Sequence, residues 1–134
     1  MADGHLLELP EDDKVAYHGA AVIAANFITT LGAAGIELMA TGTGVTREAA
    51  RISLNPLMSK TVEHLKTVEP TDALTGPFAR YDLSAIHAHV TALKRIAPTW
   101  LPTYSVLAIA TAQMLEWDDE QRTALREILT SGTL

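Results

Sequence analysis

Apolar residues between Glu11 and Ala40 recur three or four positions apart, which is the spacing of one face of a helix. Acidic residues crowd the first turn, where negative charge suits the helix dipole. Small residues fill the other faces, and Gly32 and Gly35 each cost about 1 kcal/mol relative to Ala, which indicates close packing or a kink there. The pattern predicts a long central helix enclosed on several sides, and its apolar positions are Val15, Val22, Ile23, Phe27, Leu31 and Leu38.

About five shorter helices are expected to pack around this long one, giving an all-α fold. The segment Gly42 to Gly44 stops the long helix, since glycine is common just past a helix C-terminus. Thr46 and Asp82 are predicted N-caps, and Asp118 with Gln121 has the spacing of a capping box. A loop is expected over 69–81, and the predicted helices cover residues 47–54, 56–68, 83–96, 102–115 and 118–130.

The N-terminal end differs from the rest, because residues 5–9 form a short apolar stretch that stops at Pro10. It resembles a strand, and a single strand cannot satisfy its own backbone groups. The stretch is therefore expected either to be irregular or to pair with a sheet of a partner or of an upstream domain.

Charge and composition exclude several kinds of partner. The 134 residues have ten Lys and Arg against sixteen Asp and Glu, a net charge of -6, and Lys94–Arg95 is the only adjacent basic pair. Nucleic acid and anionic membrane surfaces would therefore repel the chain. The absence of cysteine excludes disulfides, thiolate zinc sites and a cysteine nucleophile.

The uncharged stretch 19–36 is nearly long enough to span a bilayer. It contains Asn26, Thr29 and Thr30, Glu37 follows it directly, and no aromatic belt flanks it. We therefore expect a helix of a soluble domain. Because no signal peptide is visible either, the expected location is cytoplasmic.

Two further motifs have simpler explanations than a ligand site. The stretch Gly42-Thr43-Gly44 lacks the third glycine of a dinucleotide fingerprint, because Arg47 stands there, and it follows a helix rather than a strand. His87 and His89 are two apart on a helix and point to different faces, so they cannot chelate one metal ion. Trp100 and Trp117 are expected to be core or interface anchors.

Two groups of residues remain as candidate sites. His18 and Asn26 lie along one face of the long helix, and they either bond to neighbouring backbone or face a substrate or cofactor. In the loop 74–82, Thr75 and the Gly76 N–H can meet an anion, and Arg80 can hold a carboxylate or phosphate. The alternative for Arg80 is an ion pair with Asp72 or Asp82.

The motifs Tyr17-His18-x-Ala-Ala-Val-x-x-Ala-Asn26, Leu54-x-Pro56-Leu57 and Ala73-Leu74-Thr75-Gly76-Pro77-x-x-Arg80-x-Asp82 resemble the C-terminal domain of the bacterial Rossmann-like and DUF2520 proteins. That family is related to pyrroline-5-carboxylate reductase, ketopantoate reductase and the 6-phosphogluconate dehydrogenase-like superfamily. The resemblance implies the helical C-terminal-domain fold of that superfamily and an NAD(P)-binding Rossmann domain upstream. On this interpretation residues 1–10 are a remnant of that domain or a linker, and 11–134 form the dimerisation and substrate domain.

The resemblance also implies where the chemistry would lie. In the wider superfamily this helix offers a catalytic Lys with an Asn four residues later; Asn26 matches the Asn, whereas Val22 stands at the Lys position. Valine cannot donate a proton, and His18, one turn earlier, is the candidate replacement. The resemblance implies a homodimer that holds no dinucleotide in this chain and is inactive alone, the NAD(P) belonging to the full-length protein. The alternative is a non-catalytic helical interaction module.

Overall fold

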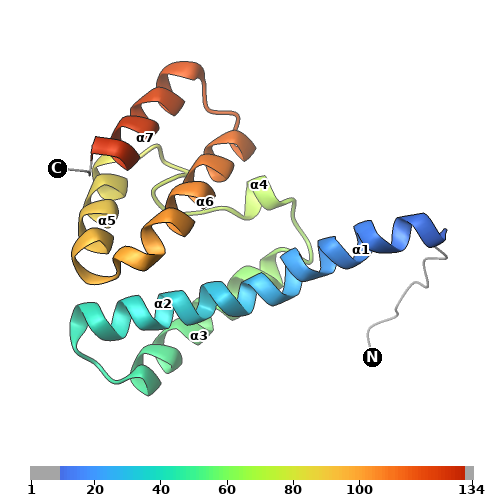
Figure 1. Ribbon diagram of the computed structural model, residues 1–134, viewed down its shortest axis with the longest axis horizontal. Coiled ribbons are helices and arrows are strands. Elements are labelled where there is room, and N and C mark those ends of the chain that lie inside the picture. Colours follow the sequence, from blue (N-terminus) through green and yellow to red (C-terminus); the bar gives the residue numbers. More distant parts are fainter. Residues whose placement is uncertain (1–9, 132–134) are drawn as a thin grey trace. The chain divides into compact units, whose positions relative to one another are not determined.

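The computed structural model describes residues 10–131, and every regular element among them is a helix (Figure 1). The predicted all-α fold is therefore confirmed. The chain divides into two compact units, residues 1–33 and 34–134. The predicted strand over residues 5–9, and with it most of the predicted N-terminal remnant, lies outside the described residues.

The predicted long helix is present and runs from Lys14 to Thr43. A 3-10 turn, Glu11–Asp13, precedes it, and its two α-helical parts are α1 (Lys14–Ala21) and α2 (Phe27–Thr43). Between them, residues Val22–Asn26 form a π turn, in which the Phe27 N–H donates to the Val22 carbonyl. The irregularity thus lies at this π turn, and a kink at Gly32 or Gly35, one of the two explanations that the sequence left open, is not observed.

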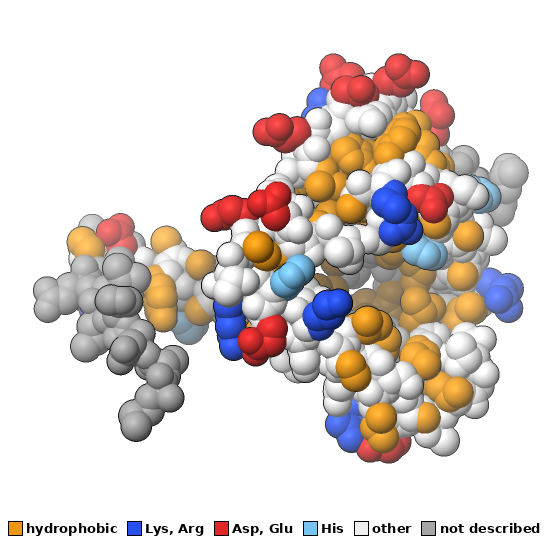
Figure 2. Space-filling view, turned by 180° about the vertical axis from the view of Figure 1, so that it is seen from behind, with side chains coloured by type: hydrophobic (Ala, Val, Ile, Leu, Met, Phe, Trp, Pro, Cys, Tyr) orange, Lys and Arg blue, Asp and Glu red, His pale blue; other side chains and the backbone are white. Residues whose placement is uncertain are grey.

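The prediction that this helix is enclosed on several sides is wrong for the single chain. No residue of α1, of the π turn or of α2 is buried. The buried core is made elsewhere, by the C-terminal helices, so many apolar side chains remain on the surface (Figure 2). By length and composition alone, the helix could cross a membrane, which is weak evidence because core helices of soluble proteins and signal sequences share these properties.

In the second unit, α3 (Arg47–His64) is one helix where the sequence predicted two. Pro56 lies inside it; the missing N–H removes one hydrogen bond, and the helix continues on both sides of the gap. The start is as predicted, because the Thr46 hydroxyl accepts from the Ala49 N–H at 3.1 Å. The stop before it is also confirmed: Gly44 has a φ of 76°, and its N–H donates to the Ala40 carbonyl.

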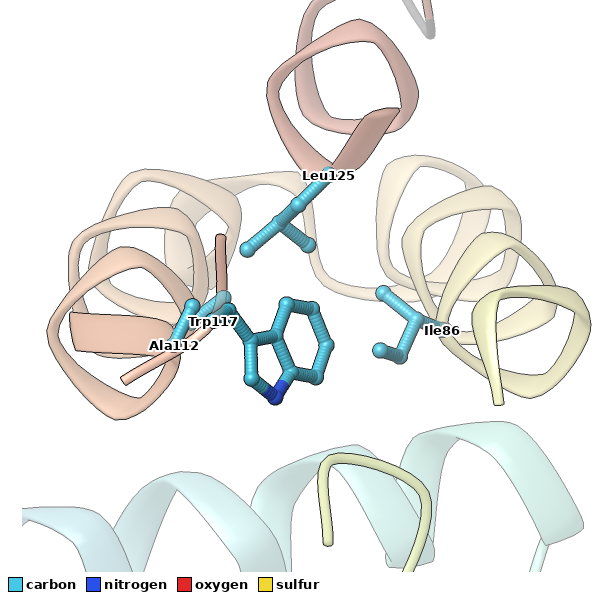
Figure 3. Packing of buried hydrophobic residues seen from close by; sticks show 5 residues of the cluster. Ile86, Ala112, Trp117 and Leu125 are labelled. Atoms are coloured by element: carbon cyan, nitrogen blue, oxygen red, sulfur yellow. The ribbon is translucent and has the colours of Figure 1, made fainter. Parts of the chain in front are cut away.

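The core of the second unit is formed by α5 (Leu83–Ile96), α6 (Leu101–Met114) and α7 (Asp119–Ser131). A 3-10 turn, Pro98–Trp100, joins α5 to α6. Side chains from the three helices and from the segment after α6 point toward one another in Figure 3. The buried members of this cluster are Ile86, Ala108, Ala112, Trp117 and Leu125, so Trp117 is the core anchor that the sequence predicted.

Two of the three core helices, α5 and α7, begin at the predicted caps. The Asp82 carboxylate accepts from the Ala85 N–H at 3.0 Å at the start of α5. Before α7, the Asp118 carboxylate accepts from the Gln121 N–H at 2.8 Å, and the Gln121 side chain accepts from the Asp118 N–H at 3.0 Å. The predicted capping box is therefore present with both of its hydrogen bonds.

The C-terminal half of α2 packs closely on neighbouring helices. A Cβ added to Gly35 would lie 3.6 Å from Leu54 of α3, and one added to Gly42 would lie 3.3 Å from Ile96 of α5. Trp100 is half-buried there, and its indole N–H donates to the Glu37 carboxylate at 3.1 Å. Small residues in this part of α2 thus allow the close helix approach that the sequence indicated.

Candidate functional site

The loop with the predicted anion-binding residues follows a short helix, α4 (Pro70–Ala73), which the sequence did not predict. Gly76 has a φ of 84°, a conformation that suits glycine. Tyr81 has a φ of 52°, which is uncommon for a residue with a side chain. The Asp82 N–H donates to the Pro77 carbonyl at 2.8 Å, so the backbone turns sharply between these two residues.

Aromatic side chains hold this loop against the core. Tyr81 meets Trp117 edge-on with ring centroids 4.8 Å apart, and Phe78 stacks on the same indole at 6.1 Å. Phe78 also lies 6.5 Å from Tyr104 of α6. These ring contacts stabilise the uncommon backbone of Tyr81 and anchor this end of the loop to the core.

The row of rings ends in a pair that sequence reasoning missed. His89 of α5 lies edge-on to Tyr104 at 6.2 Å, and a hydrogen bond of 3.1 Å joins His89 Nδ1 to the Tyr104 hydroxyl. Burial raises the pKa of Tyr104, so its hydroxyl stays protonated at neutral pH. The two residues are fifteen positions apart on different helices, and no local signal could have paired them.

Arg80 lies exposed on this supported loop, as does Thr75. Among the described residues, Arg80 forms no ion pair with Asp72 or Asp82. The Asp82 carboxylate is instead used to cap α5. The alternative explanation of Arg80 as half of a structural ion pair is therefore not observed, and its guanidinium is free to bind an oxyanion.

His18 and Asn26 lie on the long helix, and both are exposed. The alternative that they bond to neighbouring backbone is not observed, since neither side chain forms a hydrogen bond within the described residues. The π turn affects their alignment. Two α-helical turns take 7.2 residues, and a π turn takes roughly one residue more, so eight residues bring Asn26 almost directly in line with His18.

The two polar side chains are separated by roughly 12 Å along the helix axis, at 1.5 Å per residue. One small group cannot bridge that distance, so only a ligand of comparable length would touch both. Val22 lies between them, half-buried, with no group that can donate a proton. The structure thus brings His18 and Asn26 onto one face of one helix, and Thr75, Gly76 and Arg80 onto one loop.

The segment Gly42–Gly44 does not fit a dinucleotide phosphate. It lies at the C-terminal end of α2, where carbonyl groups and the negative end of the helix dipole are found. The glycine loop of a dinucleotide-binding site instead places the phosphate at the N–H groups of a helix N-terminus. Within residues 10–131, no three His, Asp or Glu side chains are grouped so that they could hold a metal ion.

The sequence matches one family model, described as a domain of unknown function (DUF2520), over residues 2–111. No curated protein and no solved structure matches the chain. The family match includes the long helix, α3, the Thr75–Arg80 loop, α5 and most of α6. Because the match covers well over half of the sequence, the chain belongs to the DUF2520 family.

Proposed function

We propose that this chain is the substrate-side and dimerisation domain of an NAD(P)-dependent oxidoreductase-like protein. DUF2520 is a C-terminal helical domain of NAD(P)-binding oxidoreductase-like proteins. The proposal assigns the dinucleotide to a separate upstream domain, in agreement with a Gly42–Gly44 segment that does not fit a phosphate. It assigns dimerisation and contact with the substrate to the helices described above.

The uneven distribution of apolar side chains supports dimerisation. Among the described residues, eight of the nine buried apolar residues lie between Ile86 and Leu125. By contrast, twelve of the sixteen large apolar residues that are exposed lie between Val15 and Val68. The N-terminal half of the chain therefore exposes apolar side chains of the kind that a folded protein normally buries. This observation is the main support for the proposal, since such surfaces mark interaction sites.

The energy available from covering this surface is large enough for a dimer. Val15, Ile23 and Phe27 are 79%, 66% and 51% exposed. Fully burying such a side chain gains about 1.5–3 kcal/mol, so these three give about 3–6 kcal/mol per copy and twice that for two copies. The other exposed apolar residues add to this gain, which is comparable to an association cost on the order of 4–15 kcal/mol.

A second copy is a suitable cover, because the stretch 19–36 has no charge. Two copies can pair there without like-charge repulsion, in spite of the net charge of -6. Glycines and alanines in the same stretch let two helices approach closely. A two-fold interface also uses the same surface on both partners.

Sedimentation velocity at tens of micromolar tests this part of the proposal, with an expected mass of twice 14.4 kDa. Ile23→Asp should give a monomer, because the carboxylate would be buried without a partner. Val106→Asp, on α6, is the matched control, since Val106 is 67% exposed and Ile23 66%. The control should remain a dimer. A monomeric parent chain, or a control that dissociates equally, would contradict the assigned surface.

The substrate-side role rests on the exposed guanidinium of Arg80, which forms no ion pair among the described residues, and on a loop that Phe78 and Tyr81 anchor to Trp117. It is tested by replacing His18 or Arg80 with Ala in the protein that includes the nucleotide-binding domain. Loss of ligand binding with unchanged thermal stability would support the role. Unchanged ligand binding in both variants would favour a non-catalytic interaction module. The isolated chain should not bind NADPH with micromolar or tighter affinity. Micromolar binding would overturn the assignment of the dinucleotide to the other domain.

A further inference from the structure

Lys94, in the last turns of α5, has a buried ammonium without a partner. Among the described residues, its Nζ is the one side-chain nitrogen or oxygen atom that is removed from solvent and accepts or donates no hydrogen bond. An ammonium has three N–H donors, and burial of a charge without acceptors is unfavourable. The position is therefore one that an incoming acceptor would stabilise.

The sequence on both sides of Lys94 contains basic residues and lacks acidic ones. From Leu83 to Leu115 the chain contains no Asp or Glu, although its net charge is -6, and Lys94 is followed directly by Arg95. Exposed His87 lies seven residues before Lys94, two turns earlier on the same helix face. This stretch of sequence is thus basic in an acidic protein.

Four of the ten lysines and arginines form ion pairs with a carboxylate three residues earlier in the described part of the chain. These pairs are Glu11–Lys14, Glu48–Arg51, Glu63–Lys66 and Asp119–Arg122. Lys94 has no such partner, since Thr91 stands three residues before it. The Glu37 carboxylate, which reaches the nearby Trp100, accepts the indole N–H and forms no ion pair with Lys94.

We propose that Lys94 Nζ binds an oxyanion, the carboxylate or phosphate group of a small ligand. The four-carbon stem of lysine is flexible and presents rotatable donors, so Nζ can turn from its buried position to an anion at the surface. The partly exposed side chain gives the ligand access. The site depends neither on the proposed dimer nor on a nucleotide-binding domain, and its failure would leave the proposed function intact.

The test measures the melting temperature of the full chain in sodium phosphate and in sodium acetate, each against sodium chloride at the same ionic strength. At about ten times the dissociation constant, a bound anion should raise the melting temperature by about 3–6 °C. Lys94→Met should abolish this increase, and Lys60→Met is the matched control because Lys60 is an exposed helical lysine. Lys94→Gln serves as a second variant if Lys94→Met does not fold.

An increase in phosphate alone that is lost on Lys94 replacement assigns a phosphate group, and one in acetate alone that is lost in the same way assigns a carboxylate. An increase in both that is lost on Lys94 replacement supports the general oxyanion site. The proposal is overturned if neither anion stabilises the parent chain more than chloride does. It is also overturned if the Lys94 variants gain as much from the anions as the parent chain and Lys60→Met do.

Discussion

Replacing Ile86 with Ala tests whether the α5–α6–α7 cluster holds the chain folded. Ile86 is fully buried at 0% exposure, and the substitution removes three carbon atoms. At about 0.8 kcal/mol for each buried carbon, the transfer loss is about 2.4 kcal/mol. The cavity left behind adds to this, because the helices on each side relax only in part. We expect a loss of about 3–4 kcal/mol in the free energy of unfolding.

The matched control is Ile52→Ala on α3, where the isoleucine is 58% exposed. Ala is the better helix former, so this change should cost less than about 0.5 kcal/mol. Urea unfolding followed by circular dichroism measures both losses, and it is run at low protein concentration so that association does not contribute. Equal losses for the two variants would refute the assignment of the core to the C-terminal helices.

Further predictions concern helix ends, glycines and pH. Asp118→Ala should lower the free energy of unfolding by about 1 kcal/mol because it removes a hydrogen bond of the capping box. Asp119→Ala removes an exposed ion pair and should lower it clearly less, and urea unfolding measures both losses. Gly44→Ala should destabilise the fold by about 1 kcal/mol because φ is 76° at this residue. Gly19→Ala, at an open helical position, should stabilise the fold by about the same amount, and a lower free energy of unfolding in that variant would contradict this. Burial raises the pKa of Tyr104 above 10.0, so the native state keeps a proton that the unfolded state releases, and stability should fall as the pH rises through 10. Tyr104→Phe should remove that part of the loss, and an unchanged pH profile of unfolding would show that burial has no such effect.

The candidate site could be predicted from sequence only in part. The residues Thr75, Gly76 and Arg80 were recognised by their types and by the family resemblance, and they do lie together on one loop. The freedom of Arg80 was not predictable, because it depends on Asp82 capping α5 instead of pairing with the guanidinium. The His89–Tyr104 pair forms only when two helices pack side by side, and the spacing of the two residues in the sequence does not predict it.

The same division applies to the helices. Caps at Thr46, Asp82 and Asp118 involve residues three positions apart, and their local pattern was sufficient to predict them. Pro56 misled the prediction, since a local rule places it at a helix start while α3 continues through it. The π turn over Val22–Asn26 has no recognised sequence signal, and it brings His18 and Asn26 into line.

An apolar stripe indicates that one face of a helix packs against another surface, and it does not identify that surface. For residues 14–43 the sequence implied a buried helix, yet in the single chain no residue of that helix is buried. Local patterns determined the helices and their ends, because propensities and caps act within a few residues. Which helices form the core, which side chains stay uncovered and which charges remain unpaired were decided by contacts between residues far apart in the chain, and only the folded structure makes those contacts.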